Sequence, residues 1–418
     1  MQTRKLCSVL PASYRSNVVF LRNVAVNAAT VNEEQDVKVE GRPWQEVPGP
    51  KSLPLIGQLY HFLPGGLFYK TTNQEFTRKA LELYGPIVRL NGMPGMPPMI
   101  MLFDPQCAEQ VLRGENWLPH RPGFQSLEYF RHYYKNNNTI TNEPTGLVTD
   151  HGEPWKQFRS TVNPILLQPK TIKLYTSALE EVANDMIQRL TKHFLDKAKE
   201  DLKNKKKTDD EKGVLEKLLD IDEKVAHIMA SDMLFAGVDT TANTIMYNLY
   251  LLAVNPKKQE KLREEVMSQN DKKPYLKACI KESLRLLPVV SGNMRMSSKE
   301  YNLRGYKIPK GTHITFIHQD MAQLEEHYIK PKEYIPERWL VPKDDPLYYG
   351  NAHPFAYSPF GFGARMCIGR RIAELEVQTF LAKLIQNFKV EWVGPPLNVK
   401  QTSLNYAAPP YNFVLKDV

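Results

Sequence analysis

The chain has 418 residues, of which 42% are hydrophobic and 24% charged, and its formal net charge is +9 at pH 7. Such a composition is that of a globular protein with one large core or two modest ones. Four widely spaced cysteines without any CxxC pattern argue against a disulfide framework or a structural zinc site and indicate a reducing compartment. The positive charge suits an acidic protein or an anionic membrane face better than nucleic acid, because no nucleic-acid-binding motif accompanies it.

The first segment, residues 1–32, contains Arg4, Lys5, Arg15 and Arg22 and no acidic residue. This composition predicts a mitochondrial transit peptide, and a disordered basic tail is the alternative. Its apolar run NVVFL is far shorter than the ~20 residues that span a bilayer. We therefore expect a mitochondrial protein that is soluble or peripherally bound once mature.

Residues 33–57 are predicted to be an extended, proline-rich arm, because Pro48, Pro50 and Pro54 preclude a helix there. The segments IVRL and MIMLF, separated by glycine and proline, predict a small sheet. A helical pattern follows from Trp155 to Asn255, interrupted by a charged run at 197–212 that we expect to be a solvated linker. Residues 58–418 are thus predicted to form a single domain.

The stretch SPFGFGARMCIGRRIAEL places Cys367 directly before an amphipathic helical pattern. A helix N-terminus favours a negative sulfur, so we expect a lowered pKa and a ligand role, whereas a small buried side chain is the alternative. Gly361 and Gly363 permit a tight turn and the close approach of a flat cofactor. Arg365 is spaced to reach a carboxylate. The helix is expected to bury Ile372, Leu375, Phe380, Leu384 and Phe388.

These residues carry a resemblance to a known family. Phe360, Gly363, Arg365, Cys367 and Gly369 match the FxxGxRxCxG loop of the cytochrome P-450 family, in which a cysteine thiolate holds haem iron. The resemblance implies a mainly α, P-450 fold, a helical haem-binding domain with a small β-rich region. It also implies a thiolate-ligated haem b with Cys367 as the axial iron ligand.

A second match lies in KESLR, where Glu282 and Arg285 stand three apart and can pair on one helical face. The pair resembles the family's ExxR, and Arg338 in IPERW resembles the arginine of its PERF segment. In the family these three residues form a buried network that braces the haem loop. An ordinary surface ion pair, worth less than about 1 kcal/mol, is the alternative.

A third match is MLFAGVDTTANT, in which the small residues Ala236 and Gly237 are poor choices for a long helix. It resembles the family's AGx(D/E)T(T/S) signature. The resemblance implies that Ala236 and Gly237 leave a groove for dioxygen, while Asp239 and Thr240, with Thr241 beside them, deliver protons and water. A kinked core helix with a threonine bonded to its own turn is the alternative.

Further arginines resemble the family's contacts to the haem propionates. Trp155 and Arg159 in WKQFR match its WxxxR, and Arg295, ten residues after Arg285, matches another propionate contact. Several arginines are chemically sensible for a dianionic cofactor, because buried carboxylates need paired donors.

The electron donor is implied by four basic residues. Lys277 and Lys281 lie on the ExxR helix, and Arg370 and Arg371 follow the cysteine. This pattern resembles the mitochondrial class, in which such residues receive a small acidic iron–sulfur ferredoxin served by its reductase. Two lysines on an ordinary solvated face are the alternative.

Three segments are most similar in sequence to insect mitochondrial members of the detoxification type: RPWQEVPGPKSLPLIG, NPILLQPKTIKLY and KACIKESLRLLPVVSGNMR. The implied reaction inserts one oxygen atom from O2 into an apolar small molecule, xenobiotic or steroid-like, and a steroid-hormone role stays open. A peripheral contact with the matrix side of the inner membrane is also implied, and nucleic acid is not.

The chain departs from the family in length. Only 80 positions separate Arg159 from Asp239, where the family has several more helices, including those that roof the substrate pocket. A haem-binding but catalytically inactive shortened isoform is therefore the second hypothesis, and a helical interaction protein without haem is the third. By resemblance the substrate-pocket candidates, for which plain packing is the alternative, are Phe124, Phe130, Val289, Val290 and Leu404.

Overall fold

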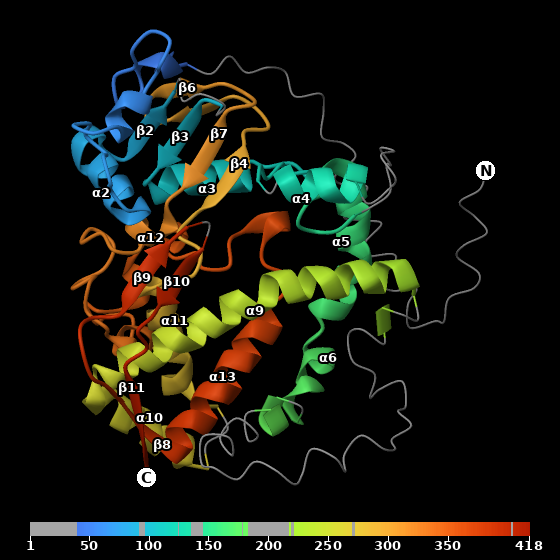
Figure 1. Ribbon diagram of the computed structural model, residues 1–418, viewed down its shortest axis with the longest axis vertical. Coiled ribbons are helices and arrows are strands. Elements are labelled where there is room, and N and C mark those ends of the chain that lie inside the picture. The colour runs from blue at the N-terminus through green and yellow to red at the C-terminus, as the bar shows by residue number, and fades with distance from the viewer. Residues whose placement is uncertain are drawn as a thin grey trace. The chain divides into compact units, whose positions relative to one another are not determined.

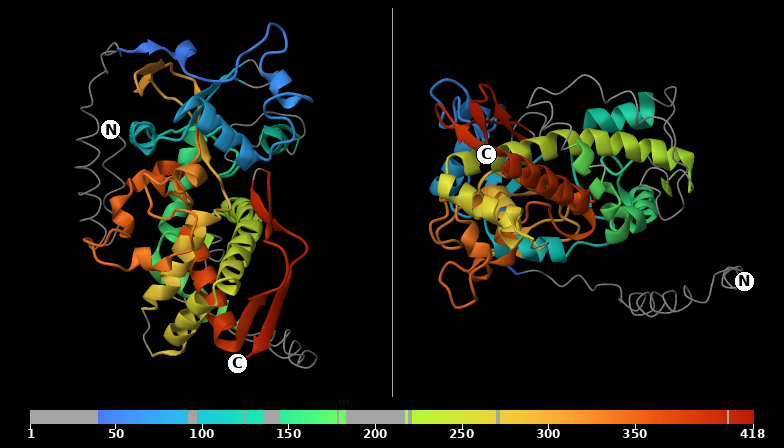
Figure 2. Two further views of the ribbon diagram at one scale, coloured as in Figure 1. Left: turned by 90° about the vertical axis from the view of Figure 1, so that its left-hand side faces the viewer. Right: turned by 90° about the horizontal axis from the view of Figure 1, so that it is seen from below.

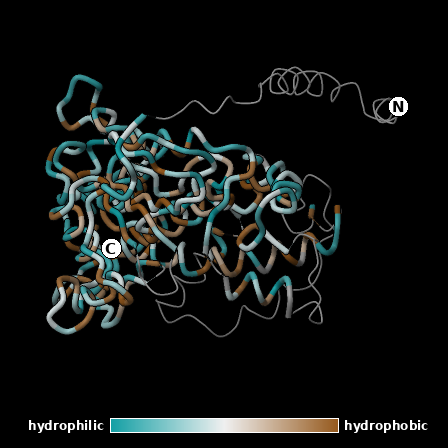
Figure 3. The backbone as a smooth tube through the Cα atoms, turned by 90° about the horizontal axis from the view of Figure 1, so that it is seen from above, coloured by the Kyte–Doolittle hydropathy of each residue, from teal (hydrophilic) through white to brown (hydrophobic). Residues whose placement is uncertain are grey.

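The structure is a computed structural model that describes residues 40–91, 97–123, 125–134, 145–177, 179–182, 217–218, 221–269, 272–402 and 404–418. The predicted transit peptide and the charged linker at 197–212 lie outside these residues. Residues from Arg42 to Val418 form one compact unit, which therefore includes part of the arm predicted for 33–57. In the described segments, no helix combines the length and apolarity needed to cross a bilayer, and hydropathy alternates along the chain (Figure 3).

The largest sheet joins strands from distant parts of the sequence. The expected pair is present: β2 (Ile87–Leu90) runs antiparallel to β3 (Met99–Leu102). β3 pairs in parallel with β7 (His313–Phe316), which pairs antiparallel with β4 (Asn293–Met296) (Figure 1). The resulting order β2-β3-β7-β4 fixes Arg295 of β4 at one edge of this sheet.

Smaller sheets complete the β-rich part. Three strands pair in the order β1-β6-β5, and two antiparallel pairs, β8 with β11 and β9 with β10, lie near the C-terminus (Figure 2). Their bounds are β1 Arg42–Pro43, β5 Tyr301–Leu303, β6 Tyr306–Ile308, β8 Phe388–Trp392, β9 Asn398–Gln401, β10 Asn405–Ala408 and β11 Phe413–Asp417.

The helical part is built around α9 (Glu223–Ala253), whose first turn is capped by the Asp222 carboxylate. It packs against α10 (Pro256–Met267), α11 (Pro274–Leu286) and α13 (Arg370–Asn387) (Figure 1). A shared apolar core joins these four helices, with fully buried residues such as Leu252, Leu262, Cys279, Leu381 and Ile385. The mainly helical fold with a small β-rich region is thus confirmed.

The remaining helices are shorter. They are α2 Asn73–Tyr84, α3 Pro105–Arg113, α4 Gln125–Tyr129, α5 Gly152–Leu166, α6 Pro169–Lys173 and α12 His318–Met321. Single helical turns occupy Trp44–Glu46, Leu59–Phe62, Phe130–Tyr134, Pro336–Trp339, Tyr349–Asn351, Pro354–Ala356 and Gly363–Arg365.

The proline-rich arm is docked rather than free. β1 pairs in parallel with β6, and Val47 is buried in the core beside Trp44. The backbone at Gly49 approaches so closely that a Cβ there would lie 2.2 Å from the Arg89 carbonyl oxygen, so only glycine fits. This part of the arm is held by the sheet edge, which a linker would not be.

The buried face of α13 differs from the expected one. Leu384 is buried as predicted and so is Phe388 just beyond the helix, but Ile372, Leu375 and Phe380 are only half-buried. The fully buried stripe instead contains Val377, Leu381, Leu384 and Ile385, because α9, α10 and α11 cover that side. The first turns of α13 pack against a different cluster, centred on α5.

Candidate functional site

The loop that carries Cys367 is closed by its own backbone. The Cys367 N–H donates to the Phe360 carbonyl at 2.9 Å, and Gly361 and Gly363 adopt φ values of +72° and +74°. Glycine adopts this left-handed conformation without strain. The loop then runs into α13, for which Gly369 is the N-cap, so the thiol stands just ahead of the first helical turn.

The thiol of Cys367 is reached by solvent although protein atoms surround it. Desolvation raises its pKa, while the Gly369 amide and the guanidinium groups of Arg159, Arg370 and Arg121 act in the opposite direction. The sequence-based expectation of a lowered pKa is therefore wrong, because desolvation outweighs the helix terminus. A coordinated metal ion would favour the thiolate, because its positive charge offsets this desolvation.

Two arginines close to the thiol keep donor capacity unused. Arg159 of α5 donates to the Met366 carbonyl at 2.9 Å, but its buried Nε has no hydrogen-bond partner. Burial lowers its pKa to about 10. Burial and the charge of Arg295 likewise lower the pKa of Arg121, which has no acidic partner among the described residues.

Arg365 is held by several contacts within the chain. Its guanidinium donates to the carbonyls of Pro119 at 3.0 Å and Asp150 at 2.9 Å, and it covers the ring of buried Trp155 at 3.8 Å from the centroid. Burial, reinforced by neighbouring arginines, lowers its pKa to about 9. Arg365 thus ties the cysteine loop to the segments before α4 and α5, and its role toward a cofactor carboxylate stays a prediction.

Arg295 already has a carboxylate partner. Its Nε lies 2.7 Å from Oε1 of Glu115, and both side chains are buried. Burial raises the pKa of Glu115, while Arg295 and Arg365 lower it. Two carboxylates act on a cluster of four guanidinium groups, those of Arg121, Arg159, Arg295 and Arg365: Glu115 acts on Arg295 and Arg365, and Asp150 acts on Arg365.

This excess of buried positive charge is a test of whether a haem fits. Unbalanced buried cations are costly, and carboxylates are their usual partners. A dianionic cofactor beside Cys367 would supply two. The orphaned Nε of Arg159 and the solvent-accessible thiol are therefore the donor set that a haem requires.

The α9 signature faces open space. Ala236, Gly237 and Asp239 are exposed, and a Cβ built on Gly237 would meet no atom within 4 Å. The Thr240 hydroxyl donates to the Ala236 carbonyl at 2.7 Å, so it is bonded to its own turn. Thr241 donates to Glu376 of α13 at 3.2 Å, a contact between two helices that the sequence analysis did not foresee.

Glu282, Arg285 and Arg338 are brought together and are fully buried. Arg285 donates to both Glu282 oxygens at 3.0 and 2.8 Å, and Arg338 donates to one of them at 2.9 Å. The remaining guanidinium hydrogens reach carbonyls of Ala322, Pro331 and Ile329. Every partner is satisfied, which is the condition under which a buried ion cluster is stable.

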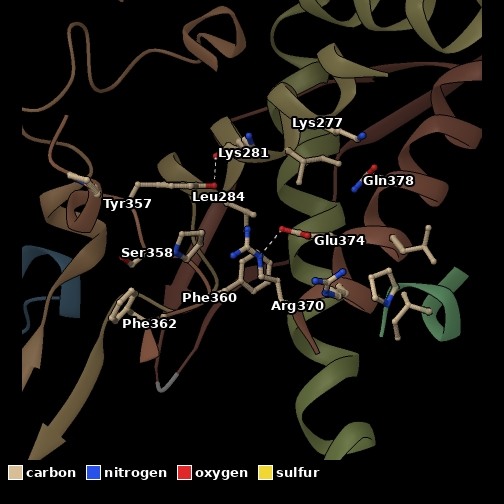
Figure 4. A pocket seen from close by; sticks show the side chains of 18 of the residues that line it. Lys277, Lys281, Leu284, Tyr357, Ser358, Phe360, Phe362, Arg370, Glu374 and Gln378 are labelled. Carbon is tan, nitrogen blue, oxygen red and sulfur yellow. Dashed lines mark hydrogen bonds and ion pairs between the residues drawn. The ribbon is translucent and has the colours of Figure 1, made fainter. Parts of the chain in front are cut away.

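The four basic residues proposed for donor docking line one groove of about 790 Å³. Lys277 and Lys281 come from α11, and Arg370 and Arg371 come from the start of α13 (Figure 4). Apolar residues of the cysteine loop, including Phe360 and Phe362, form part of its wall. Among the described residues that line it, Glu374 is the sole acid, and it pairs with Arg370 at 2.9 Å.

The substrate-pocket candidates separate into groups. Val289 and Leu404 pack in one cluster with Tyr247 of α9, and Val290 beside them is half-buried. Phe130 is exposed in the turn after α4. Phe124 lies outside the described residues.

Comparison with known proteins addresses the family. The cytochrome P450 family model matches residues 47–205 and 201–416. The chain belongs to the cytochrome P450 family. The boundary between the two matched segments falls in the predicted charged linker, where the sequence indicates that helices of the family are missing.

Curated relatives agree with this assignment. Cytochrome P450 CYP12A2 of Musca domestica is 32% identical and is covered over 97% of both chains. "Probable cytochrome P450 12a5, mitochondrial" of Drosophila melanogaster is 31% identical, with 91% of this chain and 92% of the relative covered. The alignment with the Musca protein spans 527 positions, more than the 418 residues here, so it includes gaps where this P450 lacks residues of its relative.

Several residues of this P450 site were missed by sequence reasoning. Glu115, Arg121 and Glu376 stand in no motif that we recognised, and each meets its partner through the fold. Arg121, for example, acts on Cys367 from 246 positions away. The one available signal was the HRPG sequence around Arg121, a polar turn between two helices.

Proposed function

We propose that this P450 inserts one oxygen atom from O2 into an apolar small molecule and takes its electrons from a mitochondrial ferredoxin. The observation that carries the proposal is the accessible Cys367 thiol beside a cluster of buried arginines with too few carboxylates. A haem b held by Cys367 would supply the redox chemistry that activates dioxygen.

The chain's own arginines would orient that cofactor. Arg121 and Arg159 have free donor capacity for its carboxylates, and Arg295 would share such a group with Glu115. Gly363 and Gly369 keep the loop backbone free of bulky side chains, the ring of Trp155 lies under the Arg365 guanidinium, and that of Phe360 lies under the Arg370 guanidinium. Charge-assisted hydrogen bonds of this kind are about twice as strong as neutral ones.

The α9 signature would handle protons. Asp239 is exposed and can exchange protons with solvent, and the Thr240 hydroxyl lies 3.4 Å from the Gly237 carbonyl and 2.7 Å from that of Ala236. Positioned acid and hydroxyl groups of this kind contribute roughly 10²–10⁴-fold in rate. Ala236 and Gly237 leave room for a small reactant, and Thr241, held by Glu376, fixes the turn beside them.

The groove around Lys277, Lys281, Arg370 and Arg371 suits an acidic protein. Its rim is cationic, so it would attract and orient a ferredoxin's carboxylates, which raises association rates chiefly at low salt. Relatives named as mitochondrial support a mitochondrial location. The ferredoxin with its reductase, and a peripheral contact with the matrix side of the inner membrane, are proposed by resemblance to the mitochondrial class.

The substrate would contact the apolar residues beside α9. Val289 and Leu404 pack near Tyr247, and Val290 lies next to them. These side chains suit an apolar molecule, xenobiotic or steroid-like, and Phe124 and Phe130 are carried as further contacts by resemblance.

A second candidate is a haem-binding but catalytically inactive form. The observation that favours it is the short segment between Arg159 and Asp239, which are only 80 positions apart, whereas the family has several more helices there. A site open to water loses reducing equivalents to side reactions.

The test is turnover of the purified holoprotein with a mitochondrial ferredoxin, its reductase and a panel of apolar substrates. Oxygenated product that falls about 100-fold in Thr240→Val, with haem binding unchanged, supports the monooxygenase. Haem binding with reductant consumed only to peroxide or water, in the parent protein and in Thr240→Val alike, supports the inactive form instead.

A further inference from the structure

Trp339 occupies the position at which the PERF segment has phenylalanine, and it differs from phenylalanine in having an indole N–H. Its indole N–H donates to Oε2 of Glu282 at 2.9 Å, a bond that phenylalanine cannot make. Trp339 therefore belongs to the buried Glu282–Arg285–Arg338 cluster, and the indole supplies one of the hydrogen-bond donors to this carboxylate.

The other side of the same ring meets a cation. The Nζ of Lys281 lies 5.4 Å from the Trp339 ring centroid and 5.9 Å from that of Tyr349. The two rings are stacked on one another, with centroids 4.8 Å apart and an angle of 27°. Tyr357 packs on Trp339 and donates its hydroxyl to the Lys281 carbonyl at 3.2 Å, so side chain and backbone of Lys281 are both held.

Lys281 lies on the rim of the basic groove (Figure 4). Lys277, one helical turn earlier, lines the same groove but has neither a ring nor an acidic partner in the part of the chain that the structure describes. The two lysines therefore differ in pre-organisation. The Lys281 ammonium is already held in the free protein, whereas the Lys277 ammonium has to be ordered when a partner binds. Ordering a long side chain at an interface carries an entropic cost that pre-placement removes.

We propose that Tyr349 and Trp339 are positioning residues that hold the Lys281 ammonium through their rings for a carboxylate of the electron donor, while the Trp339 N–H separately supports the buried ion cluster. This rests on the proposed function, because the donor is the partner that the groove is argued to receive. Tyr349 and Trp339 thus pre-organise one cation of the basic groove. Charge alone would attract an acidic partner without fixing where its carboxylates bind.

The first experiment is a double-mutant cycle on donor affinity, measured by titrating a purified mitochondrial iron–sulfur ferredoxin into the holoprotein. Tyr349→Leu is expected to weaken binding about two- to fivefold, the range of one exposed cation–π contact, and Tyr349→Phe to restore it. In the Lys281→Gln background the effect of Tyr349→Leu should vanish. In the Lys277→Gln background it should persist in full, which makes Lys277 the matched control.

The second experiment separates the two sides of Trp339. Trp339→Phe keeps a ring and removes the N–H, so haem retention on heating should fall while ferredoxin affinity stays within twofold. Trp339→Leu should lower both. Should Trp339→Leu fail to fold, the Tyr349 cycle still decides, because Tyr349 makes no contact with Glu282 in the described structure.

Additive effects of Tyr349→Leu and Lys281→Gln would overturn the positioning role while leaving a ferredoxin-dependent enzyme intact. Absence of ferredoxin binding by the parent protein would overturn the proposed donor and, with it, this inference. A readout without any donor is the NMR signal of 13C-methylated Lys281. We expect it to be shifted upfield by the aromatic rings and to return to the position of an ordinary lysine in Tyr349→Leu.

Discussion

The two sides of the cysteine loop differ in how completely their side chains are buried and paired. Behind the loop, the buried Glu282 receives hydrogen bonds from two buried arginines and from a partly buried indole and backbone amide. On the side of α9, Leu234 and Val238 are exposed next to the segment from Ala236 to Thr241. The difference teaches that the ion cluster behind the loop depends on close, paired contacts within the fold, whereas this part of α9 presents its side chains outward.

The largest expected effect is on the buried ion cluster around Glu282. Glu282→Gln leaves Arg285 and Arg338 buried without a carboxylate, which should lower the free energy of unfolding by about 3–5 kcal/mol. Chemical denaturation of the holoprotein measures it. The matched control is Glu374→Gln, which removes the partly exposed partner of Arg370 and should cost less than about 1 kcal/mol. Equal losses in both variants would contradict a special role for the interior cluster.

A second prediction about the buried interior concerns the pH dependence of the free energy of unfolding. Burial lowers the pKa of His318 to about 4. The unfolded chain protonates this histidine near pH ~6.5, so between pH 6.5 and 4 the unfolded state binds more protons and stability falls as the pH falls. The full loss from this group is on the order of 3 kcal/mol. Melting temperatures across this range should fall less steeply for His318→Gln; an unchanged slope would show that His318 does not titrate as a buried group.

The next effect concerns cofactor retention. Arg159→Gln removes the guanidinium whose Nε lacks a partner, and one charge-assisted hydrogen bond is worth about 1.5–3 kcal/mol, so haem affinity should fall roughly 10- to 100-fold. Transfer of haem to an acceptor such as apomyoglobin measures this affinity. Lys156→Gln, on the exposed side of the same helix, is the control and should leave the transfer rate unchanged. Equal transfer rates for the two variants would remove Arg159 from the cofactor site.

The smallest effect on the free energy of unfolding is expected for the exposed face of α9. Leu234→Gln changes an exposed residue of α9 and should alter the free energy of unfolding by less than about 0.5 kcal/mol. Leu381→Ala, in the buried stripe of α13, should cost about 2–5 kcal/mol in the same assay. A large loss in Leu234→Gln would mean that this face of α9 is covered in the folded protein.

Local patterns were enough to predict much of the fold and part of the site. β2, β3, the helix after Cys367 and the pairing of Glu282 with Arg285 depend on neighbours in sequence or on one helical turn. Residues whose roles depend on distant partners were beyond such patterns. Glu115 meets Arg295 across a sheet edge, and Trp339 reaches Glu282 from 57 positions away.

Two expectations failed for a related reason. The buried stripe of α13 is decided by which helices cover it, and the pKa of Cys367 is decided by desolvation from the whole surrounding fold. Amphipathic periodicity and the helix terminus give only the local contribution to each. The contacts of Arg365 were likewise beyond local patterns, because the carbonyls of Pro119 and Asp150 that it binds lie more than 200 positions earlier in the chain.

The most direct test of the central claim, that Cys367 holds a haem as its thiolate ligand, is the absorption spectrum of the reduced, CO-bound protein. We predict the red-shifted Soret band of thiolate ligation in the parent protein and in Thr240→Ala. In Cys367→Ala, this band should disappear. A protein that binds no haem, or a band that persists in Cys367→Ala, would contradict the account.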